Sequence, residues 1–263
     1  MNYWLLSCLS FGVGIVVGLT GIGGAALITP MLIMVFKVPA AIAVSSDVVA
    51  ATLMKVVGGI KHWRQQTLDP QIVKWLALGS VPGALTGVGV FHLMRGNWSE
   101  DWNALLLRVL GSMILLVTLL GLVQLIISTW LPQFQLPTLP QFDLATWQGR
   151  SATLAIGATL GFMVGLTSVS SGSMFALALM AFFQLDARKL VGTDISQAAI
   201  LLGFTSLGHI GLGTVDWAVV GAIWLGSVPG VLLGAKLCQF APQRPLRAIV
   251  YSLLMMASWK LVV

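Results

Sequence analysis

Two aspartates, Asp47 and Asp194, lie inside long apolar stretches of the sequence, each directly after two small residues. An ionisable side chain at membrane depth costs several kcal/mol unless it is paired, so such a residue is a candidate for function. Desolvation favours the neutral form of a carboxyl group, which would let Asp47 or Asp194 carry a coupling proton. The alternative is that both aspartates lie at the membrane interface, where they cap a helix or reach toward water.

A lysine follows the first aspartate at helical spacing. Lys55 lies eight residues after Asp47 (55 − 47), which is about two turns of an α-helix. This position makes Lys55 a candidate fixed positive charge toward an anion. A lysine can equally bury its apolar stem and place its ammonium group at the interface.

Two clusters of small residues interrupt the apolar stretches, and a short apolar segment follows each cluster. A helix that begins at such a break presents free backbone N–H groups and the positive end of its dipole, which together attract an anion. The alternative role is close helix packing, which is the interpretation we favour for Gly14 and Gly18. From the clusters and the lysine we expect these substrate-binding residues: Thr20, Gly21, Gly23, Gly24, Lys55, Thr167, Ser168, Ser170, Ser171, Gly172 and Ser173.

The composition is that of a membrane protein. Of 263 residues, 57% are hydrophobic and 8% are charged, against about a quarter charged in a soluble domain. The basic residues behind the net charge of +6 are scattered at segment ends, so we expect no nucleic-acid partner. The three histidines and two cysteines show no metal-ligand spacing, and no serine-nucleophile pattern occurs. We therefore expect no catalytic residues, no metal and no cofactor.

Hydropathy, glycine, proline and charge divide the chain into ten apolar segments. Two of them, 25–36 and 173–183, are too short to cross a hydrocarbon core of about 30 Å comfortably. The other eight cover 2–20, 39–60, 71–94, 103–130, 150–167, 187–207, 216–240 and 245–263. The predicted fold class is all-α: a polytopic transmembrane helical bundle with broken or re-entrant helices.

The chain also contains two copies of one sequence unit. Gly18-Leu19-Thr20 recurs as Gly165-Leu166-Thr167, and the motif Gly-Ser-Val-Pro-Gly occurs at 79–83 and at 226–230. Both pairs are offset by 147 (165 − 18 and 226 − 79), and the same ungapped offset pairs Asp47 with Asp194. Biased composition would not align Asp and Pro in one register. We assign 1–130 to repeat 1, 131–149 to a connecting loop and 150–263 to repeat 2.

Each copy holds five segments, an odd number, so the two repeats have inverted topology if all segments cross. Inverted repeats with interrupted helices are usual in secondary transporters. The positive-inside rule places the loop at 61–70 in the cytoplasm, because ten of the 14 basic residues then fall on or near that face. We expect His62 and His209 in loops, and we expect Pro82 and Pro229 to kink their helices.

The motifs resemble those of one known family. Copy one carries Gly-Leu-Thr-Gly-Ile-Gly-Gly at 18–24, Val-Ser-Ser-Asp at 44–47 and Leu-Gly-Ser-Val-Pro-Gly at 78–83, and copy two matches at 190–195 and 226–230. Over nearly its whole length the chain resembles the TauE/SafE sulfite exporter-like permeases. The resemblance implies a multi-pass transporter of the bacterial inner (cell) membrane that moves small sulfur-containing anions, such as sulfite or organosulfonates, outward. Copy two departs from the glycine-rich family pattern at 168–172.

The leading hypothesis is a secondary, proton-linked permease whose partners are the lipid bilayer, a small anionic substrate and protons. Two alternatives stay open. One is a non-transporting membrane scaffold in which glycine and proline serve packing alone, and the other is a cation-coupled transporter that uses Asp47 and Asp194. A homo-oligomer also stays open.

Overall fold

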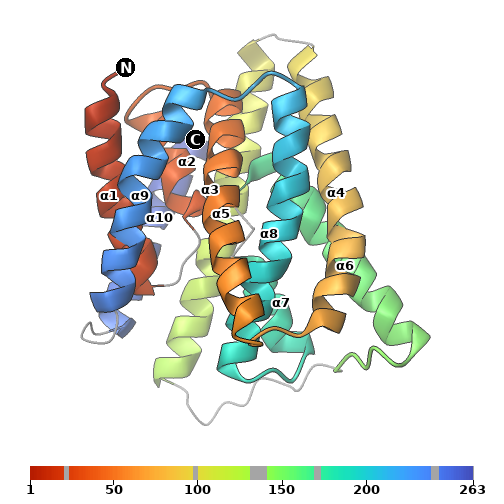
Figure 1. Ribbon diagram of the computed structural model, residues 1–263. Helices are drawn as coiled ribbons and strands as arrows, with labels where there is room; N and C mark the ends of the chain where they lie inside the picture. Colours follow the sequence, from red (N-terminus) through yellow and green to blue (C-terminus); the bar gives the residue numbers. More distant parts are fainter. Residues whose placement is uncertain (21–23, 97–99, 131–140, 169–172, 238–242, 263) are drawn as a thin grey trace. The chain divides into compact units, whose positions relative to one another are not determined.

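The computed structural model describes residues 1–20, 24–96, 100–130, 141–168, 173–237 and 243–262 (Figure 1). These residues form ten α-helices and no strand, which confirms the all-α prediction. The helices are α1 (Tyr3–Thr20), α2 (Ala25–Met34), α3 (Ala40–Arg64), α4 (Pro70–Gly96), α5 (Glu100–Trp130), α6 (Trp147–Thr167), α7 (Ser173–Phe182), α8 (Ala187–Gly211), α9 (Trp217–Leu237) and α10 (Gln243–Val262).

Six of the helices in the described ranges, namely α3, α4, α5, α6, α8 and α9, are long and apolar enough to cross a membrane. Large apolar side chains such as Leu225 and Trp63 are 76% and 71% exposed, as lipid-facing residues are. The helices α2 and α7 have ten residues each. They are the short segments that the sequence predicts after the two breaks.

The helices gather into two compact units, which do not coincide with the two sequence copies. Unit 1 comprises residues 1–50, 98–135 and 214–263, and unit 2 comprises residues 51–97 and 136–213. Unit 1 therefore combines α1, α2, α5 and the start of α3 with two helices of copy two, α9 and α10. Unit 2 combines the end of α3 and α4 with α6, α7 and α8 of copy two.

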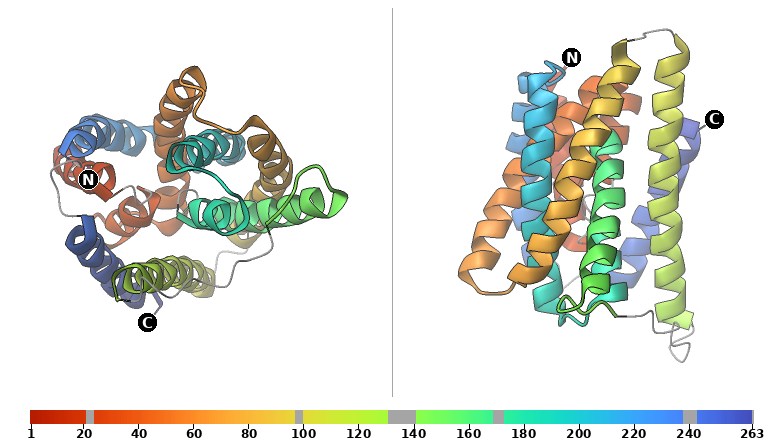
Figure 2. Two further views of the ribbon diagram at one scale, coloured as in Figure 1. Left: turned by 90° about the horizontal axis from the view of Figure 1, so that it is seen from below. Right: turned by 90° about the vertical axis from the view of Figure 1, so that its right-hand side faces the viewer.

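In unit 1, α1 lies beside α9, and α5 lies beside α10 (Figures 1 and 2). Glycine brings the backbones of α1 and α9 together: a Cβ atom at Gly226 would overlap the carbonyl oxygen of Ser7, and one at Gly230 would overlap that of Phe11. The residue numbers rise together along both helices, so the two helices are parallel. Gly14 lies against Ser227 in the same contact, which confirms its packing role.

In unit 2, α4 packs against α6 in the same way. Gly79 lies against the Leu154 carbonyl, and Gly83 lies against the Ala158 carbonyl. Each of these contacts is a contact of unit 1 shifted by 147, with the roles of the copies exchanged (226 − 79 and 154 − 7). The first helix of each copy thus packs against the fourth helix of the other copy.

The equivalent helices α3 and α8 meet inside unit 2. The Thr52 and Ser206 hydroxyls are 2.6 Å apart, and a Cβ atom at Gly59 would contact Ser196. Residue numbers rise along α3 as they fall along α8, so these two helices run antiparallel where they meet. They span 40–64 and 187–211, which are the same positions of the two copies.

The expectation that His62 and His209 lie in loops was wrong. His62 lies in the last turn of α3, and His209 lies near the end of α8, fully buried, with its ring edge-on to Phe91 at a centroid distance of 5.2 Å. Glycine and polar residues in this part of the sequence suggested loops. In an apolar surrounding, however, continuing the helix satisfies backbone groups that a loop would leave unpaired.

Candidate functional site

Unit 2 contains an ion pair between α3 and α8. The Lys55 ammonium nitrogen lies 3.6 Å from Oδ2 of Asp194, and the two side chains are 21% and 10% exposed. Two residues that the sequence singled out for separate reasons are therefore brought together. Two opposite charges that are largely shielded from solvent stabilise each other, and removing either one leaves the other uncompensated.

The ion pair is continued by an uncharged polar pair. Gln197 follows Asp194 by three residues, which places both side chains on the same face of α8. The Gln197 side-chain amide donates a hydrogen bond to the Ser80 hydroxyl on α4, at 2.9 Å. Both residues are fully buried. One face of α8 thus contacts α3 through Asp194 and α4 through Gln197.

Two buried oxygens of the polar side chains on this face of α8 have no hydrogen-bond partner among the described residues. They are Oδ1 of Asp194 and the side-chain carbonyl oxygen of Gln197. Buried acceptors without a donor are unusual in folded proteins and call for a specific explanation. A proton on Asp194 would turn one of these acceptors into a donor.

The turn after α3 fixes the start of α8 and thereby Asp194. The backbone N–H of Asp69 donates to the Thr193 hydroxyl at 2.9 Å. A Cβ atom at Gly192 would overlap the carbonyl oxygen of Thr67, so only glycine lets the turn approach this closely. Asp194 directly follows Thr193 in α8, so the same contacts fix its position.

Unit 1 repeats this arrangement around Asp47. The backbone N–H of Asp216 donates to the Ser46 hydroxyl at 3.0 Å, and the Ser45 hydroxyl donates to Oγ1 of Thr214 at 2.7 Å. Asp47 is 1% exposed, so it is buried. Asp194 is 7% exposed, so both carboxylates are buried within their units.

The partner of the carboxylate differs between the units. Oδ2 of Asp47 accepts a hydrogen bond of 2.6 Å from the Thr29 hydroxyl on α2. Copy two has Ala176 where copy one has Thr29 (29 + 147), and it has Leu202 where copy one has Lys55 (55 + 147). The partner of each aspartate is therefore a polar residue of copy one that is replaced by an apolar residue at the equivalent position of copy two.

The two breaks lie where the sequence places them. The helix α1 ends at Thr20, and Gly24 is the N-cap of α2. The helix α6 ends at Thr167, Ser168 adopts the left-handed conformation with φ 62°, and Ser173 is the first residue of α7. Thr167 and Ser168 are fully buried. The other candidates, Gly21, Gly23, Ser170, Ser171 and Gly172, lie outside the described residues.

The break after α6 and the ion pair lie toward different ends of α8. His209 forms a hydrogen bond with the backbone carbonyl of Gly165, close to the end of α6. Asp194 lies 15 residues earlier (209 − 194), or about 22 Å along a helix. Lys55, which we expected to bind substrate together with the break residues, instead lies 3.6 Å from Asp194.

Sequence reasoning missed three residues of these sites. Gln197 could have been found, because it is a polar residue three positions from an aspartate in an otherwise apolar helix. Ser80 was noted as part of a repeated motif, without a partner. Thr29 gives no such signal, since a single threonine in an apolar helix commonly bonds its own backbone.

Comparisons with known proteins agree on one family. The pattern of the family described as "Sulfite exporter TauE/SafE" matches residues 6–261. The chain is 37% identical to "Probable membrane transporter protein YjnA" of Bacillus subtilis (strain 168), over 95% of this chain and 96% of that protein. It is 24% identical to "Probable membrane transporter protein YdhB" of the same organism, over 94% of this chain and 95% of that protein.

No solved structure gives a significant match. The family match covers nearly the whole chain, and it agrees with the six apolar helices that are long enough to span a bilayer. This multi-pass membrane protein is thus a member of the TauE/SafE family of membrane transporters.

Proposed function

We propose that this chain is a secondary, proton-coupled permease that moves small sulfur-containing anions, such as sulfite or organosulfonates, across the bacterial inner membrane. The observation that carries the proposal is the ion pair between Lys55 of α3 and Asp194 of α8, two helices that are long and apolar enough to cross a membrane. A cation at such a depth attracts an anion, and a carboxylate at such a depth can take up a proton. The family description, which names a sulfite exporter, supports sulfite as substrate and export as direction.

The proposed mechanism is an exchange of counter-ions at Lys55. An arriving anion replaces Asp194 beside the ammonium group, and a proton then neutralises Asp194. The number of charges in the buried site is the same before and after the exchange, so neither state contains an unpaired buried ion. It follows that one anion and one proton cross together, so export down the anion's own gradient also carries a proton outward.

The unpartnered oxygens support the proton step. Oδ1 of Asp194 and the amide oxygen of Gln197 are buried acceptors that lack donors in the described part of the chain. A protonated Asp194 supplies a donor on the same face of α8 as Gln197. The Ser80 hydroxyl and the Gln197 amide N–H groups could then hold the oxygens of the anion without a further fixed charge.

We also propose that the two copies have inverted topology. The antiparallel contact between the equivalent helices α3 and α8 supports this arrangement, because copies of the same orientation would carry these helices in the same direction. Such repeats are typical of transporters that open alternately to the two sides of the membrane.

Flux of radiolabelled sulfite into proteoliposomes tests the proposal. We expect uptake above that of empty vesicles, stimulation by an inwardly directed proton gradient, and loss of uptake in Lys55→Leu. Asp194→Asn should keep exchange of bound anion but lose the response to the proton gradient. Lys74→Ala, which changes an exposed lysine on α4, is the control. Absence of flux for a whole panel of sulfur oxyanions would defeat the anion assignment and favour a scaffold.

A cation-coupled transporter is a second candidate, and Asp47 is the observation that favours it. The Asp47 carboxylate and the Thr29 hydroxyl lie 2.6 Å apart in the core of unit 1, and both supply the oxygen ligands that hard cations prefer. This candidate predicts that Na⁺ raises the melting temperature of the wild type and not that of Asp47→Asn. Equal melting temperatures in Na⁺ and in choline would exclude it.

A further inference from the structure

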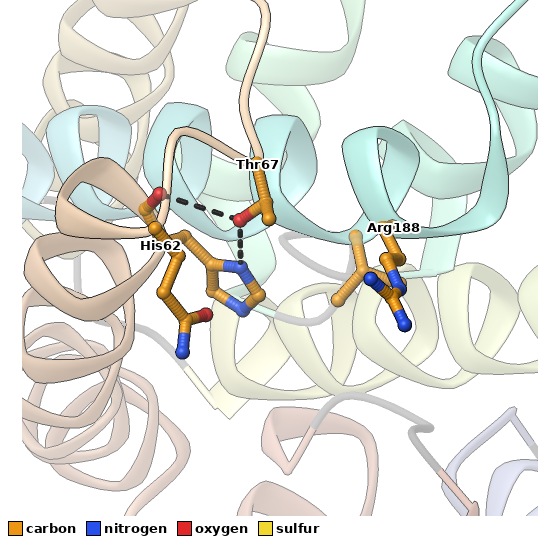
Figure 3. Close-up of a pocket in the computed structure, with 5 residues that line it drawn as sticks. His62, Thr67 and Arg188 are labelled. Atoms are coloured by element: carbon orange, nitrogen blue, oxygen red, sulfur yellow. Dashed lines mark hydrogen bonds between the residues drawn. The ribbon is translucent and has the colours of Figure 1, made fainter.

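A cavity of about 620 Å³ opens beside the turn between α3 and α4 in unit 2 (Figure 3). A second cavity of about 380 Å³ adjoins it, and the two share Thr67 and Arg188. We infer that the joined cavity is a second anion-binding site, which takes a phosphate or sulfate group. That group belongs either to a free inorganic anion or to an anionic lipid headgroup. The site is separate from the ion pair, so this inference does not rest on the proposed function.

The charges that line the joined cavity favour an anion. Arg188 faces the same open space as His62 and Thr67 (Figure 3), and Lys189 lines the adjoining part. The carboxylate of Asp186 also lines that part, and it accepts a hydrogen bond of 2.8 Å from the backbone N–H of Lys189 as the N-cap of α8. Two cations therefore face one carboxylate that already caps a helix. A guanidinium group can bind two oxygens of a phosphate or sulfate at once.

The opposite wall of the cavity is held in place by the turn itself. The Thr67 hydroxyl lies 2.7 Å from Nδ1 of His62 and donates to the backbone carbonyl of His62 at 3.3 Å. The imidazole ring is thus fixed beside the cavity. Gln65 lines the same wall and adds an amide group that can donate to an anion.

The other sequence copy shows which of these residues the fold requires. His62 and Thr67 correspond to His209 and Thr214, so the turn keeps them in both copies. By the same offset, Arg188 corresponds to Ala41 (188 − 147), Lys189 to Ile42 and Gln65 to Leu212. Ala41 is buried. The equivalent turn therefore folds without these polar groups, and in unit 2 they line the cavity.

Thiol protection tests the site directly. Val191 lines the cavity and is 46% exposed, so Val191→Cys in a chain with Cys8→Ser and Cys238→Ser places a single reactive thiol there. We expect inorganic phosphate or sulfate to slow modification of this thiol by a maleimide. Arg188→Ala should weaken the protection about tenfold, because a charge-assisted pair of hydrogen bonds is lost. Arg188→Gln serves as the second variant if Arg188→Ala does not fold.

Three controls separate the possible outcomes. Lys74→Ala should leave the protection unchanged, and a thiol placed by Lys74→Cys should not be protected. The double variant Lys55→Leu with Asp194→Asn removes both charges of the ion pair and should also keep the protection, so failure of transport would not count against this site. In nanodiscs without added anion, protection by phosphatidylglycerol and not by phosphatidylcholine identifies a lipid headgroup as the occupant. Modification rates that respond to none of phosphate, sulfate or phosphatidylglycerol would overturn the inference, as would full protection in both Arg188 variants.

Discussion

In unit 2 the buried carboxylate of Asp194 faces an ammonium group, whereas in unit 1 the equivalent carboxylate of Asp47 accepts a hydrogen bond from a threonine. The backbone around the two aspartates is held alike, by Asp69 on Thr193 and by Asp216 on Ser46. The units therefore share their packing and differ in their electrostatics. This difference shows that the same aspartate-bearing segment is held alike in both units, and that unit 1 builds it without a lysine beside the carboxylate.

Removing the lysine is the change with the largest expected effect. Lys55→Leu installs the residue that copy two has at this position and leaves Asp194 without its cation. We expect a loss of about 3–5 kcal/mol in the free energy of unfolding, the usual cost of breaking a buried pair. Sulfite flux should fall to the level of empty vesicles. Thermal unfolding in detergent and proteoliposome flux are the measurements.

The double variant Lys55→Leu with Asp194→Asn sharpens the comparison, because it removes both charges of the ion pair from unit 2. Most of the lost stability should return, since no buried charge remains. Flux should stay absent. Recovery of flux in the double variant would show that Lys55 does not bind the substrate.

Helix packing should respond equally in the two units. Gly79→Ala in unit 2 and Gly226→Ala in unit 1 each push a Cβ atom into a carbonyl oxygen of the neighbouring helix. We expect each to destabilise the protein by about 1–3 kcal/mol, the usual cost of overpacking. Thermal unfolding of the two variants side by side is the measurement.

Gly89→Ala and Gly221→Ala are matched controls on the same two helices, because no atom lies within 4 Å of the added Cβ in either case. Each should raise stability by up to about 1 kcal/mol through helix propensity. A large difference between Gly79→Ala and Gly226→Ala would break the equivalence of the two packing surfaces.

The smallest expected effect is at the threonine of unit 1. Thr29→Val keeps the shape of the side chain and removes the hydrogen bond to Asp47. Hydrogen bonds between membrane helices contribute about 0.6 kcal/mol on average, so the melting temperature should change little. The pH dependence of sulfite flux should match that of the wild type. A shift of that pH dependence would mean that Asp47, and not Asp194 alone, carries the coupling proton.

The local features of the fold could be predicted from the sequence. The small-residue clusters predicted the ends of α1 and α6, and the short apolar runs after the clusters are α2 and α7. The repeat offset gave the equivalence of Asp47 and Asp194. Each of these features depends on residues that are near one another in the chain, which is where composition and spacing carry information.

The pairing of helices could not be predicted in the same way. The glycines at 79–87 and at 226–234 form nearly identical surfaces, so the sequence does not say which of them receives Gly14 of α1. The partner of Lys55 was hidden for a related reason. Asp47, two turns away on the same helix, is as plausible from spacing as Asp194, and the antiparallel contact of α3 with α8 decides between them.

The exchanged pairing of α1 with α9 and of α4 with α6 has a consequence for biosynthesis. When the ribosome has made α1, the glycines of α9 that pack against it lie more than two hundred residues ahead (226 − 7 = 219). The helix α1 can therefore reach its packing partner α9 only when nearly the whole chain has been translated. Half a chain would leave two such surfaces uncovered, and a second half chain could supply what each lacks.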